Sequence, residues 1–249
     1  MYRGRSVTGI VDARLGSSPL DRRAMMPLGT TPVIGRLVAR LEAVDWIDRL
    51  VVVTGSVGGD DPVADYCRSS IGSVELHQTA AGDVLKGAYE IIDEDLPDWV
   101  VHVTDATPLV STKYLTTMAE HMDDHRLDGV CADPMRTGLT AGMGAGLYHR
   151  QAIVDAHLLA VDPDDRCRLD SFIRRRPCAF RLGYPPAPPA LRSNCRLRLE
   201  TIDDYRLIKT IVRSLRRPGR IIDEARAVQW LERRPDIARV NLPRASRPS

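Results

Sequence analysis

The chain has 249 residues, of which 43% are hydrophobic and 27% charged, and its 35 basic and 33 acidic side chains leave a formal net charge of +2. This length suits one large α/β domain, and this apolar content excludes a wholly disordered chain. No apolar run approaches the roughly 18 residues of a membrane span. The apolar stretch near the N-terminus ends at Val11, too early for the core of a signal peptide. We therefore expect a cytoplasmic protein with no membrane partner.

The cysteines and the basic residues narrow the classes further. The five cysteines form no C-x-x-C pair, which favours scattered thiols over a disulfide framework or a zinc site. Residues 161–249 carry 21 basic and 11 acidic side chains, against 14 and 22 in residues 1–160. A basic C-terminal third suits phosphorylated ligands, nucleic acid, an anionic membrane surface, or the acidic part of the same chain or of a second subunit. Nucleic acid is the weakest of these alternatives, because no recognised binding motif accompanies the charge.

Short apolar runs alternate with helical patterns along the first half of the chain. A cap followed by proline opens two predicted helices, one over about Pro32–Val44 with Thr31 as its cap, and one from Asp61 to about Ser70. A third covers about Asp83–Asp93. This alternation predicts an α/β, Rossmann-like fold, mostly a parallel sheet with helices on both faces, whose ligands bind beyond the carboxyl ends of the strands. The predicted buried strands are Val7–Val11, Leu50–Val53, Val74–His77 and Trp99–Val103.

The second half of the chain carries weaker signals. A helix capped by Ser111 follows the fourth strand, and a further strand and a helix from about Gln151 follow a glycine-rich segment. Residues 184–190 are too rich in proline for anything but a stiff loop. Residues 196–199 are predicted to form a strand, and residues 201–204 resemble a capping box at a helix start. We expect a single domain over residues 1–240 and a disordered tail over 241–249.

The most informative segment is the long loop after the first strand, residues 12–30. Gly16-Ser17-Ser18 offers backbone N–H groups that can cradle anionic oxygens. Arg14, Arg22 and Arg23 supply guanidinium groups, which suit phosphate oxygens. A triphosphate site needs both features, because charge accumulates on the leaving pyrophosphate. A solvated basic loop is the alternative interpretation.

This segment resembles the N-terminal signature of the cytidylyltransferases of surface-sugar biosynthesis, especially the spore-coat polysaccharide and CMP-KDO synthetase-like types. Three further segments resemble the family in the same order. Residues 60–92 resemble its second and third strand–helix units, Asp165–Ile173 stands in place of its R-E-H-V-T-P-Y-I motif, and Leu197–Tyr205 resembles its L-T-V-D-T-P-E-D-L. The resemblance covers about residues 6–215. The signature Q-A-R-x-G-S-S-R-L-P-G-K-x-L-x-P-L is matched at Ala13, Arg14, Gly16, Ser17, Ser18, Leu20, Pro27 and Leu28.

The resemblance implies a nucleotidyltransferase that takes CTP as donor, uses Mg²⁺, releases pyrophosphate and commonly forms a homodimer. In such enzymes an acceptor oxygen attacks the α-phosphorus, while the protein positions the reactants and neutralises charge. The positions that the resemblance assigns are Asp105 and Glu200 to the metal, Arg14 and Arg23 to catalysis by neutralising the triphosphate, and Asp12, Ala13, Gly16, Ser17, Ser18, Gly82 and Asp83 to the nucleotide.

The acceptor half departs from the family. Gly144 and Gly146 stand where the family has acidic residues, and Cys167 and Arg168 replace a glutamate and a histidine. The pocket is therefore less negative, and Arg168 is expected to bind an anionic acceptor such as a phosphate, a phosphonate or an acidic sugar. Asp105 also lies one residue further from the following proline than in the family turn. These changes leave open an alternative, a catalytically degenerate member that binds a nucleotide or a partner protein.

Overall fold

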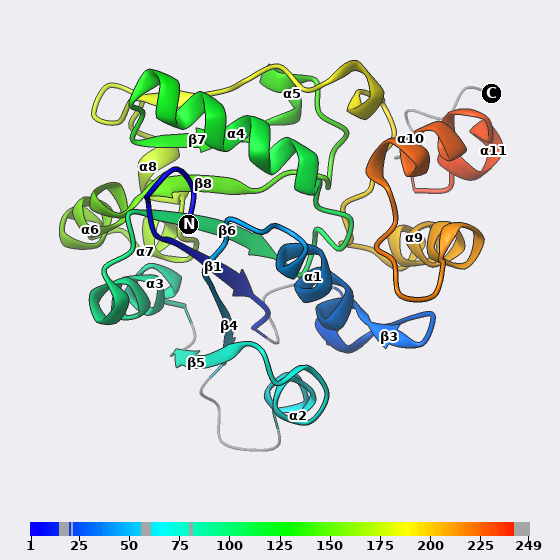
Figure 1. Ribbon diagram of the computed structural model, residues 1–249, viewed down its shortest axis with the longest axis horizontal. Helices are drawn as coiled ribbons and strands as arrows, with labels where there is room; N and C mark the ends of the chain where they lie inside the picture. The colour runs from blue at the N-terminus through cyan, green and yellow to red at the C-terminus, as the bar shows by residue number, and fades with distance from the viewer. Residues whose placement is uncertain (15–19, 21, 56–60, 80–81, 242–249) are drawn as a thin grey trace.

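A computed structural model describes residues 1–14, 20, 22–55, 61–79 and 82–241. A seven-stranded sheet runs through it, in the order β5-β4-β1-β6-β8-β7-β9 (Figure 1). β1 is parallel to β4 and β6, β4 is parallel to β5, and β8 runs antiparallel to its neighbours β6 and β7. The bounds are β1 Val7–Asp12, β4 Arg49–Gly55, β5 Glu75–Thr79, β6 Trp99–Thr104, β7 Gly129–Cys131, β8 Gly146–His149 and β9 Leu182–Gly183.

Helices cover both faces of this sheet, as the strand–helix alternation predicts. On one face, one hydrophobic core joins the sheet to α1 (Val33–Glu42), α4 (Thr112–His125) and α9 (Ile202–Leu215). On the other face, a second core joins it to α3 (Val84–Asp95) and α6 (Arg150–Leu159). Alternate residues of β1 supply the two cores, because successive side chains of a strand point to opposite faces. The fold is therefore a mostly parallel, Rossmann-like α/β fold.

Short elements complete the chain. Figure 1 shows α9, α10 and α11 gathered at one side of the molecule, next to α1. The remaining bounds are η1 Arg23–Met25, β2 Pro27–Leu28, β3 Thr31–Pro32, α2 Pro62–Tyr66, η2 Cys67–Ile71, α5 Pro134–Thr137, α7 Pro163–Arg166, α8 Ser171–Arg174, η3 Pro189–Leu191, α10 Glu224–Glu232 and α11 Pro235–Ala238.

The register of the central strands brings polar residues together at one edge. β1 pairs with β6 from Val7 opposite Trp99 to Asp12 opposite Thr104. The backbone N–H of Asp105 then donates to the carbonyl of Asp12 at 3.1 Å. Parallel strands end at the same edge of a sheet, so the loops that follow β1 and β6 lie side by side there.

The helix caps are confirmed in all but one case. Asp61 accepts from the backbone N–H groups of Val63 and Ala64, and Ser111 accepts from that of Tyr114. Thr201 and Asp204 form the predicted capping box of α9. The exception is α1, whose cap is Pro32 and not Thr31. Both of those residues lie in β3, which pairs with β2, so the hairpin and not a side-chain cap sets the start of α1.

Two further expectations concern residues 196–199 and the C-terminal boundary of the domain. The predicted strand over residues 196–199 is wrong: the segment is extended but makes only an isolated bridge, between Arg196 and Ala141. At the C-terminal boundary, Asn241 packs onto the domain, since its Nδ2 donates to the Arg196 carbonyl at 2.8 Å and to Asp204 at 2.7 Å. The rest of the expected tail, residues 242–249, lies outside the described residues.

Two findings concern the cysteines and the possibility of a membrane span. All five cysteines are free thiols. No helix in the described part of the chain has the length and apolar character needed to cross a membrane.

Candidate active site

A cavity of about 570 Å³ opens beyond the carboxyl ends of β1 and β6. It is lined by Asp12 and Arg14 from the end of β1, by Asp105 after β6, and by Glu200 just before α9. The sequence separates these residues by up to 188 positions, and the parallel sheet brings them to one place. The other charged residues of its lining are Arg23, Arg168, Asp170, Arg174 and Arg198.

Arg14 is held at the end of β1 by the carboxylate of Asp12. Its Nε donates to one oxygen of Asp12 at 2.9 Å and its Nη2 to the other at 3.0 Å. This fork-on-carboxylate pairing fixes the guanidinium plane, because both contacts must be made at once. Ala13 lies between them, is fully buried, and donates its backbone N–H to the Val53 carbonyl of β4. Gly16, Ser17 and Ser18 lie outside the described residues.

Arg23 joins two segments that are far apart in the sequence. It is 7% exposed, and its guanidinium forms an ion pair with Asp105, itself 4% exposed, and donates to the Leu199 carbonyl at 3.1 Å. The Leu199 N–H in turn donates to the Ala106 carbonyl at 2.8 Å. Burial raises the pKa of Asp105, and the hydrogen bond from Arg23 opposes that rise. Arg23 thus ties the Asp105 turn to the strand-like segment that carries Glu200.

Glu200 lies at the end of that segment, directly before the capping box of α9. Its carboxylate accepts from Arg196 and from Arg198, and its backbone N–H donates to Asp204 at 2.9 Å. Burial opposes ionisation of Glu200, but the hydrogen bond and charge of Arg198 outweigh it and lower the pKa. Glu200 is therefore an ionised carboxylate at neutral pH, aimed at the same cavity as Asp105.

The far end of the cavity is formed by β8 and the segment before α8. Tyr148 of β8 is fully buried, and its hydroxyl donates to Asp170 at 3.1 Å. A Cβ added to Gly146 would lie 2.4 Å from the Tyr148 ring, so the tyrosine fills the space that a side chain at position 146 would need. Arg168 lines this end and is exposed, and Arg174 pairs with Asp170 at 3.4 Å.

His102 and Tyr148 are site residues that the sequence analysis missed. His102 lies on β6, lines the cavity and is 8% exposed, and its buried Nε2 has no hydrogen-bond partner among the described residues. Burial lowers the pKa of His102, so its imidazole is neutral at pH 7. The sequence does contain a signal for His102, because it is a histidine within the otherwise apolar strand sequence WVVHVT. Tyr148 gave none, because a tyrosine in a strand is ordinary core material.

Gly82 and Asp83 do not line this cavity. Asp83 caps α3 by accepting from the Lys86 N–H at 3.0 Å, and its other oxygen pairs with Arg166 at 2.9 Å. Gly82 adopts a positive φ of 92° before that cap. These residues therefore have a structural role at the start of α3, and their assignment to the nucleotide stays a prediction.

The carboxylates fit a hard divalent cation by their chemistry. Mg²⁺ is usually bound through one or two carboxylates together with substrate phosphate oxygens, and not by an all-protein cage. Asp105 and Glu200 supply two such carboxylates in one cavity. In keeping with that mode, no cluster of three or more potential ligands that could hold a metal alone occurs among the described residues.

Comparison with known proteins identifies the family of the chain. A cytidylyltransferase sequence profile matches residues 8–177, which span β1 to the end of α8. The chain is 24% identical over 236 residues to an uncharacterized protein of Methanocaldococcus jannaschii, with 94% of each chain covered. It is 22% identical over 244 residues to the spore coat polysaccharide biosynthesis protein SpsF of Bacillus subtilis, covering 92% of this chain and 95% of the relative.

Solved structures share the fold. A cytidylyltransferase from Leptospira borgpetersenii superposes with a TM-score of 0.86 at 20% identity, covering 96% of this chain and 98% of the other. A CMP-KDO synthetase solved with CTP gives 0.62 at 13%, covering 84% and 99%. A Mycobacterium tuberculosis protein solved with manganese gives 0.59 at 12%, covering 82% and 98%. With its profile match over two thirds of its length, the chain belongs to the cytidylyltransferase family and is an enzyme that uses CTP for nucleotidyl transfer.

Proposed function

We propose that this enzyme transfers CMP from CTP to a small anionic acceptor in a Mg²⁺-dependent reaction. The observation that carries the proposal is the cavity itself, which is lined by two carboxylates, Asp105 and Glu200, by arginines of the β1 loop and by arginines near α8. In the reaction an acceptor oxygen forms a bond to the α-phosphorus of CTP. The bond from that phosphorus to the bridging oxygen breaks, and pyrophosphate leaves.

The donor side is assigned to Arg14 and Arg23. Negative charge accumulates on the pyrophosphate as it leaves, and guanidinium groups fixed in advance stabilise it without reorganisation. Arg14 is fixed by Asp12, and Arg23 by Asp105 and the Leu199 carbonyl. The backbone of Gly16–Ser18 is proposed to cradle the phosphates next to Arg14, and Asp12 to contact the base. Ala13, also expected at the base, is fully buried and does not line the cavity, so no contact is proposed for it.

The metal is assigned to Asp105 and Glu200. When bound there, Mg²⁺ would neutralise charge on the phosphate oxygens of CTP. The use of a divalent ion is supported by the manganese in the Mycobacterium tuberculosis structure of the same fold. Arg198 lowers the pKa of Glu200 and so keeps it ionised, while Arg23 opposes the rise in the pKa of Asp105 that burial causes.

The acceptor side is assigned to Arg168 and the polar groups around it. The fixed positive charges at this end are Arg168 and Arg174, and the carboxylate Asp170 is already engaged by Tyr148 and Arg174. A phosphate, phosphonate or carboxylate group on the acceptor would pair with Arg168. The neutral His102, with an unpartnered Nε2 in the cavity floor, offers a hydrogen bond to the acceptor.

The proposal is tested by calorimetric titration of CTP, ATP, GTP and UTP, each with and without Mg²⁺, into wild type, Asp105→Asn and Asp45→Asn. Asp45 is exposed and serves as a matched control outside the cavity. We expect selective CTP binding that requires Mg²⁺ and weakens by about tenfold or more in Asp105→Asn but not in Asp45→Asn. Acceptors would then be screened by pyrophosphate release.

Two results would count against the proposal. Binding of CTP to wild type without any effect of Mg²⁺ would favour the degenerate alternative, a nucleotide-binding protein without transfer. Absence of binding by every triphosphate would remove the nucleotide site altogether. In Asp105→Asn the buried Arg23 loses its carboxylate partner, which destabilises the protein. Thermal melting therefore checks that the variant is folded.

A further inference from the structure

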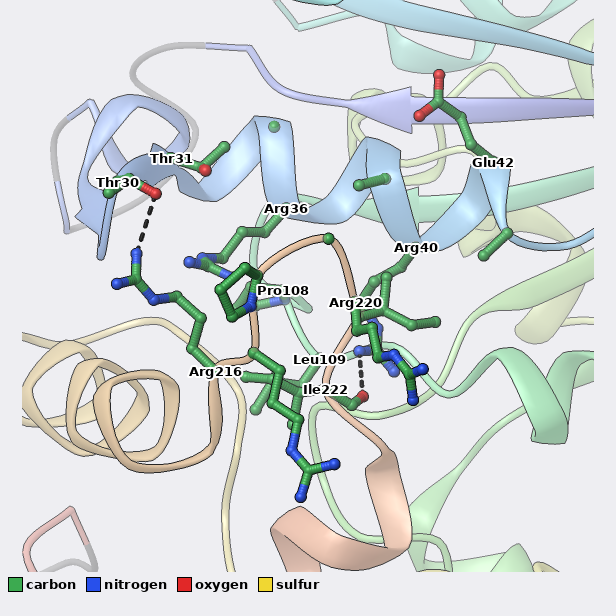
Figure 2. A pocket seen from close by; sticks show the side chains of 17 residues that line it. Thr30, Thr31, Arg36, Arg40, Glu42, Pro108, Leu109, Arg216, Arg220 and Ile222 are labelled. Atoms are coloured by element: carbon green, nitrogen blue, oxygen red, sulfur yellow. Dashed lines mark hydrogen bonds between the residues drawn. The ribbon is translucent and has the colours of Figure 1, made fainter.

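A second cavity, of about 940 Å³, lies between α1 and the chain that follows α9 (Figure 2). It shares no lining residue with the active-site cavity, among the residues that the structure describes. Its volume is within the range typical of small-molecule sites, about 300–1,000 Å³. The lining is strongly basic, with Arg36 and Arg40 from α1 and Arg216, Arg217 and Arg220 from the chain after α9.

Two of these guanidinium groups converge on the turn between β2 and β3. Arg36 donates from Nε to the Leu28 carbonyl, and Arg216 donates from Nη1 to the Thr30 hydroxyl at 3.1 Å. A Cβ added to Gly29 would lie 3.0 Å from Nη2 of Arg36 and 3.5 Å from Nη1 of Arg216, so both groups meet at this glycine. Gly29 has a φ of 77°, a conformation that favours glycine. The turn thus holds the guanidinium groups of Arg36 and Arg216 close to Gly29, where no side chain occupies the space.

No carboxylate within the described ranges forms an ion pair with Arg36, Arg216, Arg217 or Arg220. The two acidic residues that follow Arg220 are engaged elsewhere. Asp223 pairs with Lys113 at 2.7 Å, and Glu224 pairs with Arg40 at 2.8 Å. Burial lowers the pKa of Arg36, and the neighbouring charge of Arg216 lowers it further. Glu42 is the one carboxylate of the described lining, and it accepts from the Ser73 hydroxyl. With Arg40 already paired, the cavity keeps a surplus of positive charge, which is unfavourable until an anion enters.

The charge lies at two ends of the cavity. Figure 2 shows Arg216 beside Thr30 at one end and Arg220 beside Arg40 at the other. Arginine forks match phosphate oxygens better than a single point charge does. We propose that this cavity binds a small molecule carrying two or more phosphate groups, at a site separate from that of CTP.

The cavity also touches both segments that build the active site. Thr30 and Thr31 follow the Arg23 segment, and Pro108 and Leu109 follow the Asp105 turn. Those two segments are joined by the ion pair of Arg23 with Asp105. A ligand held here would therefore contact the far side of both segments, a position suited to a regulatory metabolite.

The test is calorimetric titration of inorganic pyrophosphate, without divalent cations, into wild type and four variants. Arg14→Gln removes a cation of the active site, and Arg216→Gln and Arg220→Gln each remove one from the second cavity. Arg213→Gln is the matched control, an exposed arginine of α9 that does not line the cavity. We expect a binding event in wild type that weakens by about 10- to 100-fold in Arg216→Gln and Arg220→Gln and is unchanged in Arg14→Gln and Arg213→Gln.

Three results would overturn the proposal. The first is one event only in wild type, weakened by Arg14→Gln and unaffected by Arg216→Gln. The second is an equal loss in Arg213→Gln, which would indicate general attraction to a basic surface. The third is a dimer, detected by analytical ultracentrifugation, that Arg216→Gln dissociates while pyrophosphate binding at this site is absent; this face would then be an interface between two copies. None of these results depends on whether CTP is transferred.

Discussion

At the scale of single residues, Gly142 shows why the active site needs a glycine away from the reacting groups. Its φ is 91°, and an added Cβ would lie 2.2 Å from both the backbone nitrogen of Arg198 and the carbonyl carbon of Leu197. The chain that leads to Glu200 therefore crosses directly over this glycine. The Leu197 N–H donates to the Ala141 carbonyl at 2.7 Å and fixes the crossing.

Gly142→Ala is expected to displace the Glu200 segment and to reduce turnover by about 100-fold, because a shift of about 1 Å has effects of that size. It should also lower the free energy of unfolding by about 3 kcal/mol, since a backbone contact cannot move aside as a side chain can. Gly72→Ala is the control. Its φ is 70°, but nothing lies within 4 Å of the added Cβ, so only the strain of about 1 kcal/mol remains. Urea unfolding and pyrophosphate release measure both variants, and equal effects in the two would refute the role of the crossing.

At the scale of elements, the start of α9 organises the end of the cavity where Glu200 lies. Asp204 is fully buried and accepts from four donors: the backbone N–H groups of Glu200 and Thr201, and the side chains of Arg196 and Asn241. Burial alone would raise the pKa of Asp204, but these hydrogen bonds outweigh it and lower the pKa. The capping box thus sets both the first turn of α9 and the position of Glu200.

Asp204→Asn is expected to destabilise the protein by about 3 kcal/mol at pH 7, because an amide replaces a buried, paired carboxylate. The folded-state pKa lies below the unfolded value of about 3.9, so this stabilisation is complete above about pH 4 and is lost as the pH falls through the folded pKa. Urea unfolding of wild type and variant from pH 7 to pH 3 measures the difference, which should shrink only below pH 4. Asp203→Asn, at an exposed neighbour, should cost less than about 1 kcal/mol. A difference that stays constant down to pH 3 would contradict this account.

At the scale of the whole molecule, one buried ion pair connects three distant parts of the chain. Arg40 of α1 and Glu224 of α10 are each 3% exposed and lie 2.8 Å apart. Arg40 also donates to the carbonyls of Val110 and Ile222, and Glu224 accepts from the N–H and hydroxyl of Thr112. The C-terminal helices are thereby fixed to α1 and to the loop that follows β6.

Glu224→Gln and Arg40→Met should each cost about 3–5 kcal/mol, because each leaves a buried group without its partner. The double variant should cost clearly less than the sum, which a double-mutant cycle by urea unfolding measures. Arg206→Gln, in an exposed pair with Asp203, should cost less than about 1 kcal/mol and serves as the control. Additive costs, or a separate early transition for the C-terminal helices, would show that the pair does not join them to the rest of the domain.

The strand–helix alternation, most helix starts and the family resemblance could be predicted from the amino-acid sequence alone. These features are local in the sequence. Apolar runs predict the buried strands, and the helix caps are single residues, Asp61, Ser111 and Thr201. The signature around Arg14 is one contiguous segment. The sequence also indicated Asp105 and Glu200 as partners through the resemblance, although no local pattern joins them. The assignment of each site residue to the nucleotide, the metal or the acceptor remains a prediction, for Asp105 and Glu200 as for Gly16–Ser18, Gly82 and Asp83.

How distant segments meet depends on the tertiary structure. It placed Arg23 between Asp105 and Leu199, made the segment before Glu200 a crossing over Gly142 instead of a strand, and paired β8 antiparallel with β6. It also gathered the arginines of α1 and of the chain after α9 around one cavity. These contacts join residues tens to hundreds of positions apart, and short-range periodicity carries no information about which distant partner a side chain will meet.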